Sequence, residues 1–359
     1  MSLSIAIVGL PNVGKSTLFN ALTNNNILAA NYPFATIEPN TGIVGVPDPR
    51  LDKLAELYKS EKTVPATVKF VDVAGLVKGA SQGEGLGNQF LSHIRSCSAI
   101  CHVVRAFEDN DVQHMDQDHN PKNDIDVINT ELILADLQTI DNRLKKTEKE
   151  ARANPKLRPI VDEIQKVKAI LDSGKPLNHA GENIDFELIA DLQLITAKPA
   201  IYLFNVDEET LADEQKQQEL RKLVGSAVSI FVCAKLEDEL KGLDENDATE
   251  LLESYNVSER GLDKVIHAAY DALGLQSYLT AGEKEVRAWT IKKGSTAPQA
   301  AGVIHGDFER GFIAAQIVNY EDLIEAGAEA SAKAAGKVRT EGKDYVMQPN
   351  DVVEFRFNV

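Results

Sequence analysis

The stretch Gly9-Leu-Pro-Asn-Val-Gly14-Lys15-Ser16-Thr17 matches the pattern G-x-x-x-x-G-K-[ST] and decides the fold of this chain. The apolar run before it, Leu3–Val8, is typical of a buried parallel strand, and Thr17–Leu22 after it favours a helix. A strand, a glycine turn and a helix N-terminus direct several backbone N–H groups at one point, which suits a phosphate chain. A glycine-rich turn that matches by chance is the alternative, but the flanking strand and helix argue against it. The stretch therefore predicts a P-loop in an α/β domain.

The residues of this loop have distinct expected roles toward a nucleotide. Lys15 would bring a positive charge to the β- and γ-phosphates, and the Ser16 hydroxyl would bind Mg²⁺. The backbone N–H groups of the loop would hold the phosphates. The predicted phosphate-binding residues are Asn12, Val13, Gly14, Lys15, Ser16 and Thr17. The loop thus predicts a site for the magnesium complex of a nucleoside triphosphate.

The composition is that of an ordinary soluble globular protein. With 359 residues the chain is too long for one simple core, which predicts two or three domains. Its three cysteines, Cys97, Cys101 and Cys233, are too few for a disulfide framework and favour buried thiols in a reducing compartment. No basic region of a signal peptide opens the chain, and no apolar run reaches the length of a membrane span. We therefore expect a cytoplasmic monomer without membrane attachment.

One part of the chain is basic although the whole is acidic. The net charge of −17 argues against a generic nucleic-acid coat protein, because phosphate contacts need local positive potential. Residues 141–175, however, contain ten Lys or Arg and six Asp or Glu, a local charge of +4. We call this segment the basic island. It indicates either a solvated charged surface or a contact with RNA or the ribosome.

The basic island lies within a pattern of two amphipathic helices. From Asp124 to Leu144, and again from Leu157 to Leu171, apolar residues recur at helical spacing. The two runs are separated by Asn154-Pro155, which predicts an antiparallel hairpin with the basic island at its turn and flanks. Buried strands resume after it, at 198–205 and 228–235, so the hairpin is an insertion in the nucleotide-binding domain.

Two further segments are expected to sense the nucleotide. Thr36 lies in a proline-containing loop after the P-loop helix, where it could reach Mg²⁺ and the γ-phosphate. The strand 67–72 delivers Asp72 at its carboxyl end, and Asp72-Val-Ala-Gly75 then matches D-x-x-G. Asp72 would hold the metal directly or through water, and the Gly75 N–H would contact the γ-phosphate. The glycine-rich residues 75–87 favour a nucleotide-sensing switch over a plain flexible loop.

The residues after the strand 198–205 should read the base. GTPases use N-K-x-D there, but this chain has Asn205-Val206-Asp207-Glu208, in which valine replaces lysine and the acid is one methylene longer. Guanine requires a well-placed acid, which this sequence does not clearly provide. Asn205 could serve the exocyclic amine of adenine, with Val206 packed near the ring. The open alternative is GTP, with Glu208 reaching the guanine edge.

The sequence predicts three parts for the chain. A P-loop nucleotide-binding domain would comprise residues 1–122 and 196–275, and the helical hairpin would occupy residues 123–195. Residues 276–359 contain short strands and one helix without a catalytic signature, so we interpret them as an α+β binding module.

Taken together, these features resemble the YchF/Obg-like ATPase family over nearly the whole chain. The resemblance rests on the P-loop, on Phe34–Asn40, on the Asp72–Gln89 block, on Asn205–Glu208 and on the C-terminal module, which looks like a TGS domain of the β-grasp fold. It implies a Ras-like P-loop NTPase domain with an inserted coiled-coil hairpin. It also implies slow hydrolysis of ATP, sometimes of GTP, and association with the ribosome, through its large subunit, or with RNA. Cys233-Ala-Lys235 stands where GTPases commonly have Ser-Ala-Lys and would lie behind the base.

The resemblance also exposes a missing catalytic group. Many GTPases have Gln directly after D-x-x-G to orient the attacking water, whereas this chain has Leu76. His114, in a polar loop before the hairpin, is one candidate for that role, although a surface histidine is the more ordinary reading. A bound K⁺ is another candidate, since Asn12 resembles the asparagine that holds K⁺ in cation-activated relatives.

Overall fold

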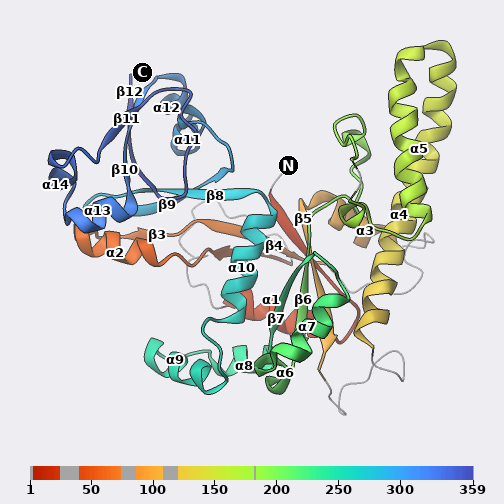
Figure 1. Cartoon of the computed structure of the whole chain (residues 1–359), viewed down its shortest axis with the longest axis horizontal. Coiled ribbons are helices and arrows are strands. Elements are labelled where there is room, and N and C mark those ends of the chain that lie inside the picture. Colours follow the sequence, from red (N-terminus) through yellow and green to blue (C-terminus); the bar gives the residue numbers. More distant parts are fainter. Residues whose placement is uncertain (1–2, 25–39, 74–85, 108–119, 182, 359) are drawn as a thin grey trace. The chain divides into compact units, whose positions relative to one another are not determined.

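The computed structural model describes residues 3–24, 40–73, 86–107, 120–181 and 183–358. The chain forms two compact units, one of residues 1–43 and 69–269 and the other of residues 44–68 and 270–359. Each unit has its own six-stranded sheet (Figure 1).

The sheet of the first unit is built around β1. Its strands are β1 (Ser4–Val8), β2 (Thr41–Gly45), β4 (Thr67–Asp72), β5 (Ala99–Ala106), β6 (Ala200–Val206) and β7 (Val228–Val232). They lie in the order β2-β4-β1-β5-β6-β7, and β1 pairs in parallel with both β4 and β5. Every residue of β1 is buried, as expected of a parallel strand that is covered on both faces. The sheet therefore confirms the α/β prediction made from the P-loop and its flanking strand.

Helices pack against this sheet, and their apolar residues form the core together with those of the strands. They are α1 (Lys15–Asn24), α3 (Leu86–Ser96), α6 (Glu208–Ala212), α7 (Glu214–Lys222), α8 (Ala234–Glu239), α9 (Glu245–Ser254) and α10 (Gly261–Ala272). On one face, Ala6 and Val8 of β1 pack with Ile94 of α3 and Ile128 of the hairpin. The P-loop strand is thus held by apolar contacts with the helix that follows the predicted switch segment.

The predicted pair of helices is present. In Figure 1, α4 (Pro121–Ala153) and α5 (Arg158–Asp172) lie side by side as a long hairpin. Asn154 ends α4, and its side-chain oxygen accepts a hydrogen bond from the Lys156 N–H at 3.3 Å, so the turn falls where Asn-Pro predicted it. Apolar residues of both helices, including Ile140 and Ile164, form one buried cluster between them.

A buried carboxylate fixes the base of the hairpin to the first unit. Asp136 of α4 is fully buried and accepts hydrogen bonds from the N–H groups of Ile195 and Thr196 at 2.9 and 2.8 Å. The Thr196 hydroxyl donates a third at 2.7 Å. Arg95 of α3 donates to Thr139 of α4 at 2.7 Å, so α3 and the hairpin share a polar junction.

The second unit has the α+β architecture expected for the C-terminal module. Its strands are β3 (Thr63–Val64), β8 (Leu275–Thr280), β9 (Val286–Lys292), β10 (Phe312–Asn319), β11 (Arg339–Glu341) and β12 (Asp351–Phe357). Its helices are α2 (Pro49–Tyr58), α11 (Ala297–Ile304), α12 (Gly306–Arg310), α13 (Tyr320–Ala326) and α14 (Glu329–Ala334). The sheet order is β11-β10-β12-β8-β9-β3, with β12 parallel to β8 and antiparallel to β10, a β-grasp arrangement.

Residues 44–68 belong to this second unit, although the sequence-based division assigned them to the nucleotide-binding domain. Within the unit, β3 runs parallel to β9, with Thr63 opposite Val286. The Arg50 guanidinium donates to the Pro349 carbonyl at 2.7 Å and to Asn350 Oδ1 at 2.8 Å. These contacts join segments that are far apart in the chain, and no local pattern in the sequence indicates them.

Candidate functional site

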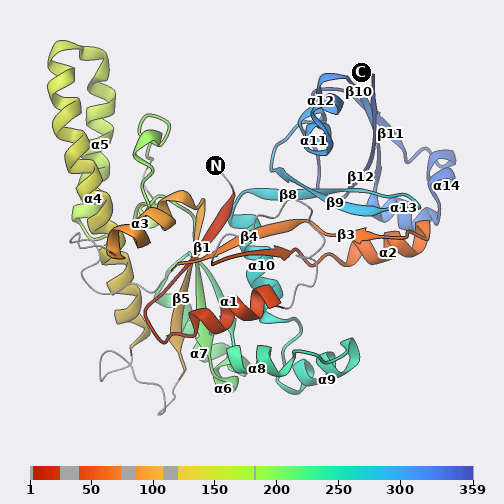
Figure 2. The same cartoon turned by 180° about the vertical axis from the view of Figure 1, so that it is seen from behind.

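The predicted site residues that the structure describes come from segments at the carboxyl edge of the first sheet. β1 lies between β4 and β5, so the strands that follow β1 in the chain are found on both sides of it. Ligands of open α/β sheets bind at such a switch point of the strand order. Ile7 of β1 is in register with Asp72 at the end of β4. Figure 2 shows β1 next to β4. The P-loop begins directly after β1, so Asp72 at the end of β4 lies close to it.

Two glycines let the P-loop adopt its path. Gly14 has a φ of +88°, a conformation that strains other residues, and a Cβ there would collide with the side-chain nitrogen of Asn205. A Cβ at Gly9 would lie only 2.7 Å from the Val103 carbonyl oxygen. Helix α1 begins at Lys15, directly after this turn, so its N-terminal N–H groups lie at the carboxyl edge of the sheet.

The charged pair of the site is formed by Lys15 and Asp72. The Lys15 side chain is only 9% exposed, and its ammonium bonds directly to a carboxylate oxygen of Asp72. Ser16 and Thr17, the next residues of α1, are exposed. Hydroxyl and carboxylate oxygens are ligands that Mg²⁺ prefers, so Ser16 and Asp72 fit the metal role expected of them.

Asn205 ties the P-loop to the start of α8. This residue is 3% exposed, and its amide nitrogen donates to the Val13 carbonyl at 3.1 Å. Its amide oxygen accepts from the Ala234 N–H at 3.2 Å. Both hydrogen bonds go to protein backbone, so Asn205 positions two loops of the site. Its contact with the exocyclic amine of a base stays a prediction.

Val206, the residue after Asn205, lies in the core of the first unit. Residues 202, 204 and 206 of β6 alternate onto one face of the sheet, and the Val206 side chain is 2% exposed. It packs in a buried cluster with Val104, Val224 and Phe231. β6 continues through Val206 and directs its side chain into the core. That this side chain packs near a purine ring stays a prediction.

The two acids that follow are already engaged within the protein. Asp207 is the N-cap of α6 and accepts a hydrogen bond from the Thr210 N–H at 2.8 Å. Glu208 pairs with the Lys235 ammonium at 2.7 Å. The hydrogen bond from Lys235 lowers the pKa of Glu208, and the same bond raises the pKa of Lys235. The sequence singled out Lys235 through the Cys-Ala-Lys motif but did not predict this pair.

Three predicted site residues lie outside the described residues. They are Thr36, Gly75 and His114. Leu76, where many GTPases have Gln, lies outside them as well. The roles given to these residues stay predictions.

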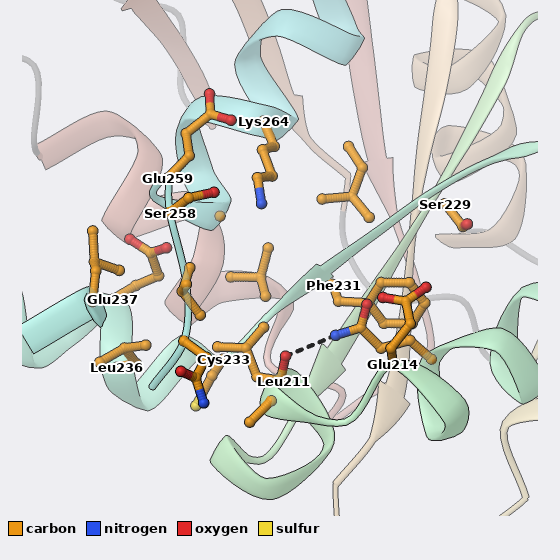
Figure 3. Close-up of a pocket in the computed structure, with 18 of the residues that line it drawn as sticks. Leu211, Glu214, Ser229, Phe231, Cys233, Leu236, Glu237, Ser258, Glu259 and Lys264 are labelled. Carbon is orange, nitrogen blue, oxygen red and sulfur yellow. Dashed lines mark hydrogen bonds between the residues drawn. The ribbon is translucent and has the colours of Figure 1, made fainter. Parts of the chain in front are cut away.

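The first unit also contains a cavity that Cys233 of the Cys-Ala-Lys motif lines, together with residues that were not predicted to belong to a site. It measures about 420 Å³ and extends along β7 between α7, α8 and the start of α10 (Figure 3). Among the lining residues, Gln217 donates a hydrogen bond to the Leu211 carbonyl at 2.7 Å. Glu237 lines it, is 3% exposed and accepts from the Leu262 N–H at 3.2 Å, and burial raises the pKa of this carboxyl. This cavity is distinct from the P-loop site.

A P-loop between β1 and α1, an acid at the end of β4 and a six-stranded sheet of this order define a P-loop NTPase. A family model described as "50S ribosome-binding GTPase" matches residues 4–135. A second model, the YchF-GTPase C-terminal family, described as a protein of unknown function, matches residues 275–358. The "Ribosome-binding ATPase YchF" of Bacillus subtilis is 51% identical over the full length of both chains. The chain belongs to the YchF family.

Two further comparisons agree with this assignment. The "Ribosome-binding ATPase YchF" of Escherichia coli O157:H7 is 49% identical, again over the full length of both chains. The solved structure of the Schizosaccharomyces pombe YchF GTPase superposes with a TM-score of 0.87 at 39% identity, covering 99% of this chain and 98% of that one. A GTP binding protein from Pyrococcus horikoshii, at 22% identity and a TM-score of 0.61, shares the fold.

The described residues hold neither a cluster of metal-binding side chains nor a membrane-spanning helix. No group of three or more His, Cys, Asp or Glu side chains that could hold a metal ion occurs among them. None of their helices is long and apolar enough to cross a membrane.

Proposed function

We propose that this chain binds and slowly hydrolyses ATP in a Mg²⁺-dependent reaction, and that it acts as a nucleotide-regulated factor on the ribosome or on RNA. The observation that carries the proposal is the juxtaposition of Lys15 and Asp72 beside the glycine-built P-loop. Relatives named ribosome-binding ATPases support both the nucleotide and the ribosome part of this proposal.

The residues of the P-loop would do most of the work through positioning and charge. Its N–H groups and Lys15 would hold the phosphates, while Ser16, Asp72 and Thr36 would hold the metal. Mg²⁺, when bound, would neutralise charge on the β- and γ-phosphates. The Lys15–Asp72 bond must open when nucleotide binds, since both side chains would then turn to the ligand and its metal.

The group that orients the attacking water is a separate proposal. With Leu76 in the usual position of Gln, either His114 or a K⁺ held by Asn12 would supply this function. Hydrolysis measured in KCl and in NaCl, for the wild type and for His114→Ala, separates the two candidates.

The choice of base favours ATP. Guanine recognition needs a free carboxylate, and the described carboxylates of Asp207 and Glu208 are both engaged. The solved fungal relative is named a GTPase, which keeps GTP as the second candidate. Competition between ATP and GTP for the wild-type protein, and for Glu208→Ala, decides between them. A strong GTP preference that is lost with Glu208 would overturn the assignment.

ATP hydrolysis should depend on the P-loop side chains of Lys15 and Ser16. Lys15→Ala and Ser16→Ala are each expected to lower ATP turnover by about 100-fold or more, because each removes a group that acts on transition-state charge. The control is Lys222→Ala, an exposed lysine of α7, which should leave turnover unchanged. Turnover is followed as phosphate release at saturating Mg²⁺. Wild-type rates in both P-loop variants would remove the proposal.

We extend the proposal to the organisation of the whole protein. The hairpin of residues 123–195 and the C-terminal module of residues 276–359 would serve as binding parts attached to the nucleotide-binding domain. Because the relatives are named ribosome-binding, we place the protein in the cytoplasm, where it would act as a monomer.

A further inference from the structure

The three residues that follow Asn205 all have side chains engaged within the protein. Val206 packs in the core, Asp207 caps α6, and Glu208 bonds to Lys235. Two loops are expected to surround a base: the one after β6, which holds Glu208, and the one that opens α8. Among these partners, Lys235 alone comes from the loop that opens α8. The Glu208–Lys235 pair therefore connects the two loops that are expected to surround the base.

The location of this pair follows from a continuous set of contacts. Lys235 follows Ala234, whose N–H bonds to Asn205, and Asn205 bonds in turn to the P-loop at Val13. The pair thus lies on the same edge of the sheet as the phosphate-binding loop. The Glu208 side chain is 30% exposed, so water or a ligand can reach it.

We propose that Lys235 determines the nucleotide selectivity of this site, because it engages the Glu208 carboxylate and so withdraws it from a purine. The inference rests on the proposed function and names the residue behind its choice of base. A free carboxylate at Glu208 would accept from the N1–H and the exocyclic amine of guanine, and it would repel the N1 acceptor of adenine. Both effects of a free carboxylate would favour GTP. Because Lys235 suppresses them, it shifts the selectivity toward ATP.

A second pair in the same unit provides a matched control. Lys216 of α7 bonds to Glu209 at the same distance, 2.7 Å, and both of its side chains are exposed. Glu209 is the direct neighbour of Glu208, but its partner belongs to α7 and not to the loop that opens α8. Loss of a surface ion pair as such can therefore be separated from loss of this particular one.

The experiment measures the dissociation constants of ATP and GTP by calorimetry in the full-length protein with Mg²⁺. Lys235→Met keeps an apolar stem that can cover the ring but removes the charge. It is expected to shift the ratio of the two constants toward GTP by about threefold to tenfold, the size of one water-screened charged hydrogen bond. Lys216→Met should leave the ratio unchanged.

The double variant Lys235→Met/Glu208→Ala should return the ratio to within about twofold of the wild type, since no carboxylate remains to be released. The proposal is overturned if Lys235→Met leaves the ratio unchanged, or if the shift persists in the double variant. A wild-type protein that binds neither nucleotide would refute the proposed function itself, which distinguishes the two failures.

Discussion

At the scale of single residues, the P-loop site depends on a close contact between the Gly14 backbone and the Asn205 side chain. Gly14 and Asn205 lie almost two hundred residues apart in the sequence, yet a Cβ on Gly14 would occupy the position of the Asn205 amide. That amide joins the Val13 carbonyl to the Ala234 N–H. A glycine is required at position 14 for its left-handed backbone and also for this close approach.

Gly14→Ala tests this double requirement. The left-handed conformation alone costs about 1–3 kcal/mol for a residue with a Cβ. Gly174→Ala is the control, because Gly174 has a similar φ of +79° but no atom within 4 Å of the added Cβ. We expect a larger fall in the free energy of unfolding for Gly14→Ala, together with a loss of ATP affinity of at least about tenfold. Equal effects of both variants on stability and nucleotide binding would contradict the Asn205 contact.

At the scale of elements, part of the unpaired positive charge of the hairpin lies on one face of α4. Several cations of the basic island are neutralised: Lys166 pairs with Glu163 at 3.4 Å, and Lys168 pairs with Asp141 at 2.7 Å. Lys145 and Lys149 are exposed, and neither forms an ion pair with another described residue. Spaced by four residues, they lie on the same face of the helix. This part of the unpaired positive charge thus lies near the hairpin turn.

Lys145→Ala/Lys149→Ala should weaken binding to ribosomes, and Lys166→Ala/Lys168→Ala should do so much less. Both variants remove two charges, but only the first pair is free to contact phosphates. In co-sedimentation with ribosomes at increasing salt, the first variant should reduce the slope of log affinity against log salt by about 1–2. An unchanged slope, or equal losses in both variants, would mean that the basic island is only a solvated surface.

At the scale of the whole molecule, the second unit is completed by residues from the first fifth of the chain. Residues 44–68 contribute α2 and β3 to it, and Arg50 attaches α2 to the turn before β12. The side-chain hydrogen bond to Asp48 raises the pKa of Arg50 further above its ordinary value. The unit is therefore assembled from two separate segments, and neither supplies its whole sheet.

Arg50→Ala should loosen this attachment. Loss of the charged hydrogen bonds to Pro349 and Asn350 is expected to cost about 1–3 kcal/mol. Hydrogen exchange of the α2 amides should accelerate by about tenfold or more, while exchange in β1 and β5 stays constant. Lys53→Ala, an exposed position on the same helix, is the control. Equal exchange in both variants would show that Arg50 does not hold the segment.

Strong local patterns predicted much of the fold and part of the site. The run before Gly9 predicted β1, helical spacing predicted α4 and α5, and Asn154-Pro155 predicted their turn. Strand and motif assigned Lys15 to the phosphates and Asp72 to the metal of one nucleotide site, and the structure brings these two side chains into contact. These features could be predicted because periodicity and turn chemistry depend only on neighbouring residues.

The sequence by itself determined that this protein has a phosphate-binding loop on a parallel sheet, a helical insertion and a separate α+β module. Only the tertiary structure decided that Val206 enters the core, that Asn205 joins two loops, and that Glu208 is paired with Lys235. It also decided that residues 44–68 complete the second sheet. The physical reason is that these outcomes depend on contacts between distant segments, whose pairing no residue pattern within either segment specifies.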